Sequence, residues 1–173
     1  TTIQALILHD IVRKLPDGSQ LELSRSGDTG QMSIRAGKAR FALQALAPDA
    51  FPSVEASDLT HSFEIDAKDL KRLIEKTQFA ISTEETRFYL NGIYLHAAEA
   101  DGTPVLRAVA TDGHRLALVD MPCPDAASGM PGVIVPRKTV LELRKLCEAT
   151  PDKMKIELSE AKIRFSTDNL VLT

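Results

Sequence analysis

The sequence predicts an α+β fold in which antiparallel sheets carry helices on one face, and it predicts this arrangement twice along the chain. Residues 5–15 have apolar side chains at helical spacing, and strand-like runs separated by turn residues follow them directly. The same order recurs after Pro136. Because 43% of the 173 residues are hydrophobic but only 5% are aromatic, aliphatic side chains must fill the core.

The first copy begins with a helix over residues 5–15 that has one buried face. That face is predicted to consist of Leu8, Ile11, Val12 and Leu15. Pro16 and Gly18 end the helical pattern. Three strands follow, predicted over residues 20–24, 31–36 and 38–46, with a turn at 27–30 between the first two.

The second copy begins with a helix after Pro136, a residue that suits the first turn of a helix. Its buried face is predicted to consist of Val140, Leu143 and Cys147. Pro151 and Asp152 end this helix, and strands are predicted over residues 153–159, 162–166 and 169–173. Both copies therefore read as one helix followed by a set of antiparallel strands.

Short sequence matches relate the two copies. RKL occurs at residues 13–15 and 144–146, LEL at 21–23 matches IEL at 156–158, and FAL at 41–43 matches LVL at 170–172. The separation of about 130 residues is the length of a domain and exceeds the periods of solenoid repeats. The stretch 47–58, rich in Pro, Ser and acidic residues, fits a boundary, which predicts domains at 1–57 and 58–173.

A further helix is expected to begin after Asp66, whose carboxylate can cap free backbone amides. Its buried stripe is predicted to consist of Leu70, Leu73, Ile74 and Thr77. Its opposite side carries Lys68, Lys71, Arg72 and Lys76. A solvated face explains such a helix taken alone. However, the first and last helices also have basic outer faces, so a shared surface for a polyanion is the alternative.

Residues 105–119 predict a β-hairpin with a tight turn at Asp112-Gly113, because these residues tolerate the positive φ of a type I′ turn. His114 and Arg115 would then begin the second strand beside the apolar Leu116. A polar pair next to an apolar side chain suits a recognition surface. Asp112 and His114 are also acid-base residue types, although neighbouring strand residues point to opposite faces.

Two adjacent aromatic residues, Phe88 and Tyr89, precede a turn signal at Asn91-Gly92. Two interpretations stay open for them. In one, the segment is a strand that buries Phe88 and Tyr94 at alternate positions. In the other, one of the adjacent rings is exposed and stacks on a base or a peptide side chain.

Composition excludes several classes of protein. A net charge of −3 disfavours nucleic-acid binding through bulk positive charge, although a local basic face is compatible with it. Cys123 and Cys147 lack metal-ligand spacing, so we expect no zinc site and no disulfide scaffold. We also expect no cofactor. No run reaches the ~18 apolar residues of a membrane span, and no common catalytic motif occurs. The absence of an initiator Met leads us to expect a fragment.

Five motifs give the chain a specific resemblance. They are ATDGHRLA at residues 110–117, RFYLNG at 87–92, VIVPRK at 133–138, DIVRKLP at 10–16 and SIRAGKARF at 33–41. In this order and spacing they resemble the bacterial DNA polymerase III β sliding clamps. The resemblance covers the end of that family's first domain and most of its second domain.

This resemblance implies a DNA-clamp fold and a homodimeric ring of six similar domains that encircles duplex DNA without reading its sequence. The protein would be a non-enzymatic processivity factor in the bacterial cytoplasm, associated with the nucleoid. Lys138 matches a family position that touches DNA, and Phe88 and Tyr89 match an aromatic pair near the template strand. Lys68 and Arg72, from the basic side of the helix after Asp66, complete the predicted DNA-facing set. The residues that match the subunit interface are Phe41 and Leu43, with Ile7 standing where some members carry a basic residue.

The resemblance also implies a pocket for short linear motifs of the type Gln-Leu-x-Leu-Phe. The partners would be DNA polymerase subunits, the clamp loader and repair proteins. The matching pocket residues are Leu90, Thr111, Gly113, His114, Arg115 and Leu116. The residues alone leave two other functions open, which are an enzyme acting on nucleic acid or nucleotides through Asp112 and His114, and an independent peptide-binding module.

Overall fold

The computed structural model describes residues 2–25, 30–47, 50, 59–149 and 152–173. The chain divides into two compact units, Thr1–Glu55 and Ala56–Thr173. Most of the predicted boundary segment 47–58, and the predicted turn at 27–30 apart from Gly30, lie outside the described residues. No helix among the described residues is long and apolar enough to span a membrane.

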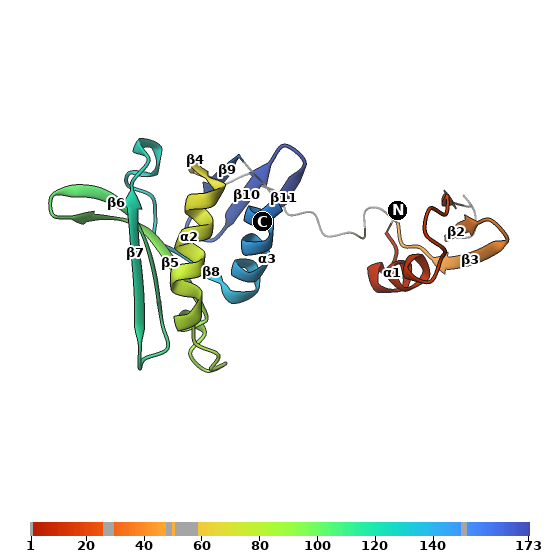
Figure 1. The fold of residues 1–173 in the computed structure, drawn as a ribbon, viewed down its shortest axis with the longest axis horizontal. Helices are drawn as coiled ribbons and strands as arrows, with labels where there is room; N and C mark the ends of the chain where they lie inside the picture. Colours follow the sequence, from red (N-terminus) through yellow and green to blue (C-terminus); the bar gives the residue numbers. More distant parts are fainter. Residues whose placement is uncertain (1, 26–29, 48–49, 51–58, 150–151) are drawn as a thin grey trace. The chain divides into compact units, whose positions relative to one another are not determined.

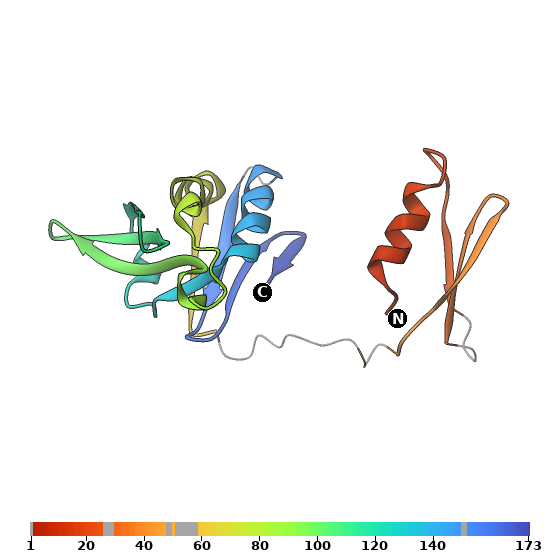
Figure 2. The ribbon, with the colours of Figure 1, turned by 90° about the horizontal axis from the view of Figure 1, so that it is seen from below.

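The part of the first unit that the structure describes consists of one α-helix and one sheet (Figure 2). Its elements are α1 (Ala5–Arg13), β1 (Glu22–Arg25), β2 (Gln31–Ala36) and β3 (Ala39–Gln44). The strands form an antiparallel sheet in the order β1-β2-β3, and Gly37, with a φ of +56°, begins the short turn between β2 and β3. Thr2 pairs with Leu46, so the start of the chain is joined to the segment after β3.

The expected buried face of α1 is only partly confirmed. Leu8 and Ile11 are half-buried, Val12 is exposed, and no residue of the helix is fully buried. On another side of the helix, Leu6 is 81% exposed. A three-stranded sheet offers too little apolar area to cover a helix completely. Apolar surface on α1 therefore remains available for contacts outside this unit.

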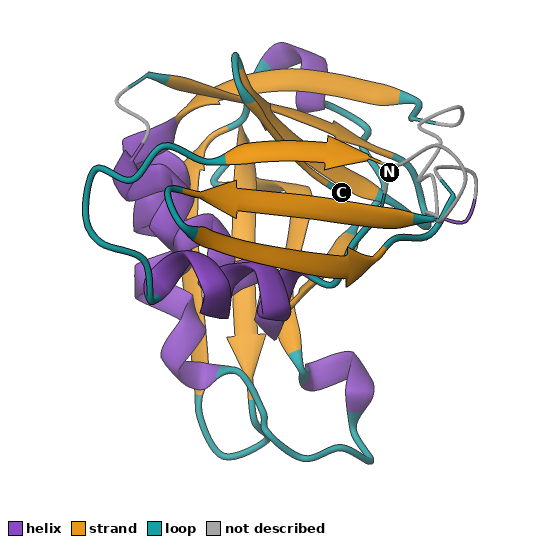
Figure 3. Ribbon diagram, turned by 90° about the vertical axis from the view of Figure 1, so that its right-hand side faces the viewer, coloured by secondary structure: helices purple, strands orange, loops and turns teal. Residues whose placement is uncertain are grey.

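Among its described residues, the second unit contains two antiparallel sheets and two α-helices (Figures 1 and 3). The helices are α2 (Ala67–Thr77) and α3 (Arg137–Ala149). One sheet has the order β11-β10-β9-β4, formed by β4 (His61–Asp66), β9 (Lys153–Leu158), β10 (Ile163–Thr167) and β11 (Leu170–Leu172). The other has the order β7-β6-β5-β8, formed by β5 (Gly92–Ala100), β6 (Thr103–Thr111), β7 (Leu116–Pro122) and β8 (Val133–Pro136).

The core of this unit lies where both helices meet both sheets. The predicted stripes on α2 and α3 are buried as expected, and Leu106 and Phe165 contribute from the two sheets. Short 3₁₀ helices occur at Gln78–Ala80, Phe88–Leu90 and Asp125–Ala127. The order of one helix followed by three antiparallel strands is present both in α1 to β3 and in α3 to β11, which confirms the predicted repeat.

The predicted turn at Asp112-Gly113 is wrong in length and type. Thr111 pairs with Leu116, so the loop between β6 and β7 has four residues, and His114 and Arg115 belong to it. In this loop only Gly113 has a positive φ. The two-residue Asp-Gly turn of the sheet is instead Asp101-Gly102, between β5 and β6, where both φ angles are positive as a type I′ turn requires.

The expected cap at Asp66 is also wrong. Asp66 occupies the position before α2, but its side chain makes no capping hydrogen bond. Its carboxylate lies 3.5 Å from the ammonium of Lys68 instead. The Ala67 amide donates to the carbonyl of Asp152, which joins the start of α2 to the start of β9. A tertiary contact thus satisfies one of the free backbone amides at the start of α2.

Candidate functional site

The loop between β6 and β7 is held by its own side chains. Asp112 Oδ1 accepts from the backbone N–H groups of His114 and Arg115, each at 3.0 Å, and Asp112 Oδ2 accepts from Arg115 Nε at 3.0 Å. Thr111 Oγ1 accepts from the Gly113 amide at 3.1 Å and donates to the Arg115 carbonyl at 2.8 Å. The loop is therefore ordered before any ligand binds, with the exposed His114 at its surface.

These contacts change the acidity of Asp112. The His114 amide, then the Arg115 amide, and also the Arg115 guanidinium hold the pKa of its carboxyl below the ordinary value. The charged form makes the hydrogen bonds, so they are fully present above the ordinary pKa and are lost as the pH falls through the lowered one.

We therefore expect acid to open this loop at a pH below the ordinary Asp pKa of about 3.9. Nuclear magnetic resonance of the His114 and Arg115 amides, followed as the pH is lowered, measures the midpoint. In Asp112→Asn the transition should disappear. A midpoint at or above the ordinary value would contradict the role given to the carboxylate.

Apolar and cationic side chains surround this loop. Leu116 is 64% exposed directly after it, and Phe79, which is 56% exposed, lies under the guanidinium of Arg115 at 5.8 Å from the ring centre. A Cβ placed on Gly113 would lie 3.0 Å from Arg87 Nη1, so the Arg87 side chain passes close over the loop backbone. Arg87 in turn pairs with Glu84 at 3.2 Å.

The structure brings most of the predicted pocket residues together. Residues 111 and 113–116 are contiguous in the loop and its two strand ends. Leu90 is half-buried three residues after Arg87, and its amide donates to the Arg87 carbonyl at 2.9 Å. The contact between Arg87 and Gly113 therefore brings the segment of Leu90 to the loop.

The two adjacent aromatic residues are not in a strand. Phe88 and Tyr89 begin a 3₁₀ helix, where they are 77% and 55% exposed, and their rings meet edge to face at 5.7 Å. The interpretation as a strand that buries Phe88 and Tyr94 is therefore wrong, and Tyr94 is also exposed. Rings presented in this way are free to stack on a ligand.

The start of α3 adjoins the segment of these aromatic residues. The Arg137 amide donates to the Asn91 carbonyl at 2.9 Å, and Asn91 Nδ2 donates to the Glu84 carbonyl at 3.0 Å. Lys138 follows Arg137 and is exposed. On α2, Lys68, Arg72 and Lys76 are exposed. Lys68 is paired with Asp66, whereas Arg72, Lys76 and Lys138 have no carboxylate partner within 4.0 Å among the described residues.

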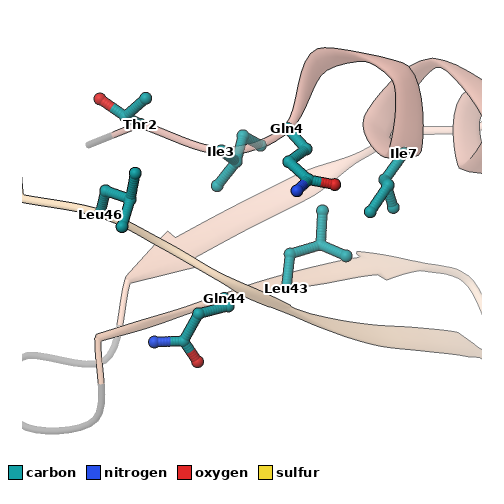
Figure 4. A pocket seen from close by; sticks show the side chains of 7 residues that line it. All are labelled: Thr2, Ile3, Gln4, Ile7, Leu43, Gln44 and Leu46. Carbon is teal, nitrogen blue, oxygen red and sulfur yellow. The ribbon is translucent and has the colours of Figure 1, made fainter. Parts of the chain in front are cut away.

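In the first unit, the predicted interface residues line or adjoin an apolar hollow. Figure 4 shows Ile7 of α1 and Leu43 of β3 pointing toward one another across it. The hollow measures about 310 Å³, and Ile3 and Leu46 also line it. Phe41 and Leu43 are half-buried on the same face of β3. Among the described residues no strand pairs with the free edge of β3.

Comparison with known proteins identifies the family. Residues 64–173 match the family model described as the DNA polymerase III beta subunit, central domain, and residues 1–55 match its N-terminal domain. The chain belongs to the DNA polymerase III β-subunit family. The resemblance stated from the sequence motifs is therefore confirmed.

Members of the β-subunit family match this chain along nearly its whole length. The beta sliding clamp of Caulobacter vibrioides NA1000 is 50% identical over 172 residues, which are 99% of this chain and 46% of that protein. The beta sliding clamp of Escherichia coli K12 is 35% identical over 173 residues, which are 100% of this chain and 45% of that protein. The chain thus spans about half the length of these relatives.

Solved β-subunit structures share the fold. The sliding clamp of Bartonella birtlesii, determined with griselimycin bound, is 53% identical and has a TM-score of 0.89 over 98% of this chain and 45% of its own. The clamp of Caulobacter crescentus is 51% identical and has a TM-score of 0.90 over 95% of this chain and 44% of its own. The predicted α+β clamp fold with antiparallel sheets is confirmed.

Two residues of the candidate pocket escaped prediction in this β-subunit chain. Phe79 follows the apolar stripe of α2, and only the three-dimensional structure shows its ring exposed beneath Arg115. Arg87 belongs to a motif that carries the resemblance, but its approach to Gly113 joins residues 26 positions apart. The sequence signal for a tight loop at this site was the glycine at position 113, because glycine tolerates the positive φ that the structure shows there.

Proposed function

We propose that this chain is the central part of a sliding clamp that encircles duplex DNA and tethers its partners without catalysing a reaction. Residues 1–57 would be the end of the first clamp domain and residues 58–173 most of the second. The observation that carries the proposal is a set of three exposed cations, Arg72 and Lys76 on α2 and Lys138 on α3, which have no carboxylate partner within 4.0 Å among the described residues and lie on adjacent helices of a confirmed clamp fold. The protein would act in the bacterial cytoplasm, on nucleoid DNA.

Duplex DNA would lie against this helix surface. Lys138 and Arg72 would contact phosphates, and Lys68 would add charge beside them. Phe88 and Tyr89, in the segment that adjoins the start of α3, would contact a strand of the DNA. Phosphate contacts carry no sequence information, which suits a protein that must move along DNA. The net charge of −3 is compatible with such contacts, because binding through a few cations does not require an excess of positive charge over the whole chain.

Replacement of Lys138 by Ala is expected to reduce the DNA affinity of the full-length protein about fivefold and to lower the salt slope of log Kd by about 0.9, the loss of one phosphate contact. Fluorescence anisotropy with duplexes of two unrelated sequences measures both quantities. Equal losses are expected on the two duplexes. An unchanged slope would contradict a phosphate contact at Lys138, and a loss on one sequence alone would contradict sequence-independent binding.

The loop between β6 and β7 would form half of a pocket for linear motifs of polymerase subunits, the clamp loader and repair proteins. Leu90 and Leu116 would receive the apolar anchors of the motif. The polar part of the pocket would consist of Thr111, Gly113, His114 and Arg115.

A fluorescent Gln-Leu-x-Leu-Phe peptide should bind the full-length protein, and Leu90→Ala or His114→Ala should weaken the binding of this peptide. Wild-type affinity in both variants would exclude this pocket.

The apolar hollow of the first unit supports a homodimeric ring. Phe41 and Leu43 would pack against the partner subunit, and the free edge of β3 offers backbone groups for pairing. Arg35, Lys38 and Arg40 lie around the turn between β2 and β3 and have no carboxylate partner within 4.0 Å among the described residues. A partner surface with acidic side chains would complement them.

The enzymatic alternative finds no support in the geometry. Asp112 accepts hydrogen bonds from the backbone of His114 and from Arg115, and none from the His114 ring. A general acid-base pair would need the carboxylate to orient the imidazole. An independent peptide-binding module would use the same loop but would not explain the basic helices or the hollow of the first unit.

A further inference from the structure

Four charged side chains form a closed network where α2 meets α3. Lys71 lies 3.4 Å from Glu148 and 3.9 Å from Glu75, and Arg144 lies 3.7 Å from each of the same two carboxylates. Each cation therefore has two acidic neighbours, one on its own helix and one on the other. We call these four residues the α2–α3 charge seam.

The antiparallel arrangement of the helices creates the seam. Lys71 and Glu75 are one turn apart on α2, Arg144 and Glu148 are one turn apart on α3, and the earlier residue of each helix meets the later residue of the other. The helices lie side by side in Figures 1 and 2. All four side chains are between a third and a half exposed, so the seam faces solvent.

Stability alone is a weak reason for such a network. Exposed ion pairs at these distances contribute about 0–1 kcal/mol each. The sequence next to the seam shows a clear contrast in charge. Arg72 and Lys76 directly follow Lys71 and Glu75 on α2, and they have no carboxylate within 4.0 Å among the described residues. Unpaired cations therefore adjoin a strip whose own net charge is zero.

We propose that Glu75 and Glu148 limit DNA affinity by keeping Lys71 and Arg144 neutralised, so that duplex phosphates contact only the neighbouring unpaired cations. This inference rests on the DNA-facing role proposed above for these helices. Each phosphate neutralised by a protein cation releases counterions and strengthens binding. A neutral seam adds no such contact, and it therefore keeps the DNA contact weak enough for the duplex to move along the surface.

The test uses the full-length protein and a fluorescent duplex, with anisotropy titrations at several salt concentrations. In Glu75→Gln/Glu148→Gln, two cations become available for phosphates. The salt slope of log Kd should then steepen by up to about 1.8, and the affinity at low salt should rise at least about fivefold. The single variant Glu148→Gln should give a smaller change of the same sign.

Two controls separate the seam from a general effect of charge. Lys71→Gln/Glu148→Gln removes one cation and one anion, and it should leave affinity and slope within about twofold and 0.3 of wild type. Glu157→Gln adds the same charge as a single seam variant, but Glu157 pairs with Lys155 at 2.8 Å on the sheet face turned away from the core. This variant should bind DNA as the wild type does.

The inference is overturned if Glu75→Gln/Glu148→Gln binds no tighter, or if Lys71→Gln/Glu148→Gln loses as much affinity as Lys138→Ala. The second result would mean that Lys71 itself contacts phosphate. Failure of the proposed function gives a different pattern, in which the wild type shows no salt-dependent binding and Lys138→Ala has no effect. That pattern overturns both proposals. If Lys138→Ala weakens DNA binding but Glu75→Gln/Glu148→Gln binds no tighter than the wild type, only the inference is overturned.

Discussion

Replacement of Gly113 by Val is expected to weaken binding of a Gln-Leu-x-Leu-Phe peptide by about 10- to 100-fold. Gly113 has a φ of +92°, a region that β-branched residues avoid, and the strain of about 1–3 kcal/mol must be relieved by moving the loop. The new side chain would also meet Arg87, 3.0 Å from the position of its Cβ. Peptide titration by fluorescence anisotropy measures the loss.

Gly102 provides the matched control. It also has a positive φ, at +76°, but it lies in the turn before β6, whereas Gly113 lies in the loop after β6. A Cβ there would meet open space. Gly102→Val should therefore lower the free energy of unfolding by a comparable backbone strain and leave peptide affinity unchanged. Equal losses of affinity in the two variants would mean that the effect is general destabilisation.

Replacement of Leu43 by Asp is expected to weaken the dimer of the full-length protein by more than about 100-fold. The new carboxylate would enter the apolar hollow beside Ile7 and Leu46, where an unpaired buried charge costs several kcal/mol. Sedimentation velocity over a range of protein concentrations measures the dissociation constant.

Ala42→Asp is the control for this interface, because Ala42 is exposed on the opposite face of β3. It adds the same charge one residue away, and the variant should remain a dimer under the same conditions. A dimer of unchanged stability in Leu43→Asp would show that the hollow is not part of the subunit interface.

Periodicity in the sequence was sufficient to predict the helices of the second unit. The buried stripe of α2 and that of α3 follow from helical spacing alone, because one face of each helix packs on a large core. The same reasoning was less successful for α1. Its apolar residues have the right spacing, but the small sheet of its unit leaves Val12 exposed. Periodicity identifies an apolar face without identifying what covers it.

Local contacts account for two differences between the predicted and the observed local structure. The Asp112-Gly113 pair has the composition of a type I′ turn, but the Asp112 carboxylate bonds two amides further along and stabilises a four-residue loop. Phe88 and Tyr89 were compatible with a strand, and a 3₁₀ helix exposes both rings. Each outcome depends on a few local contacts that residue preferences do not determine.

Candidate site residues were predictable where they share a segment. Residues 111 and 113–116 lie together because they are consecutive around one loop. Phe79 and Arg87 reach that loop from elsewhere, and the α2–α3 charge seam depends on how two helices pack. Contacts of this kind follow from tertiary structure, so helix composition alone could not separate paired cations from unpaired ones.

A topological measurement tests the clamp function most directly. The labelled full-length protein is loaded onto circular nicked DNA with its clamp loader, and its retention is followed before and after the circle is cut once. A protein that encircles DNA should remain on the circular DNA and should slide off over the free ends once the circle has been cut. Equal retention on circular and linear DNA, or release from both at the same rate, would contradict the proposal that it encircles DNA.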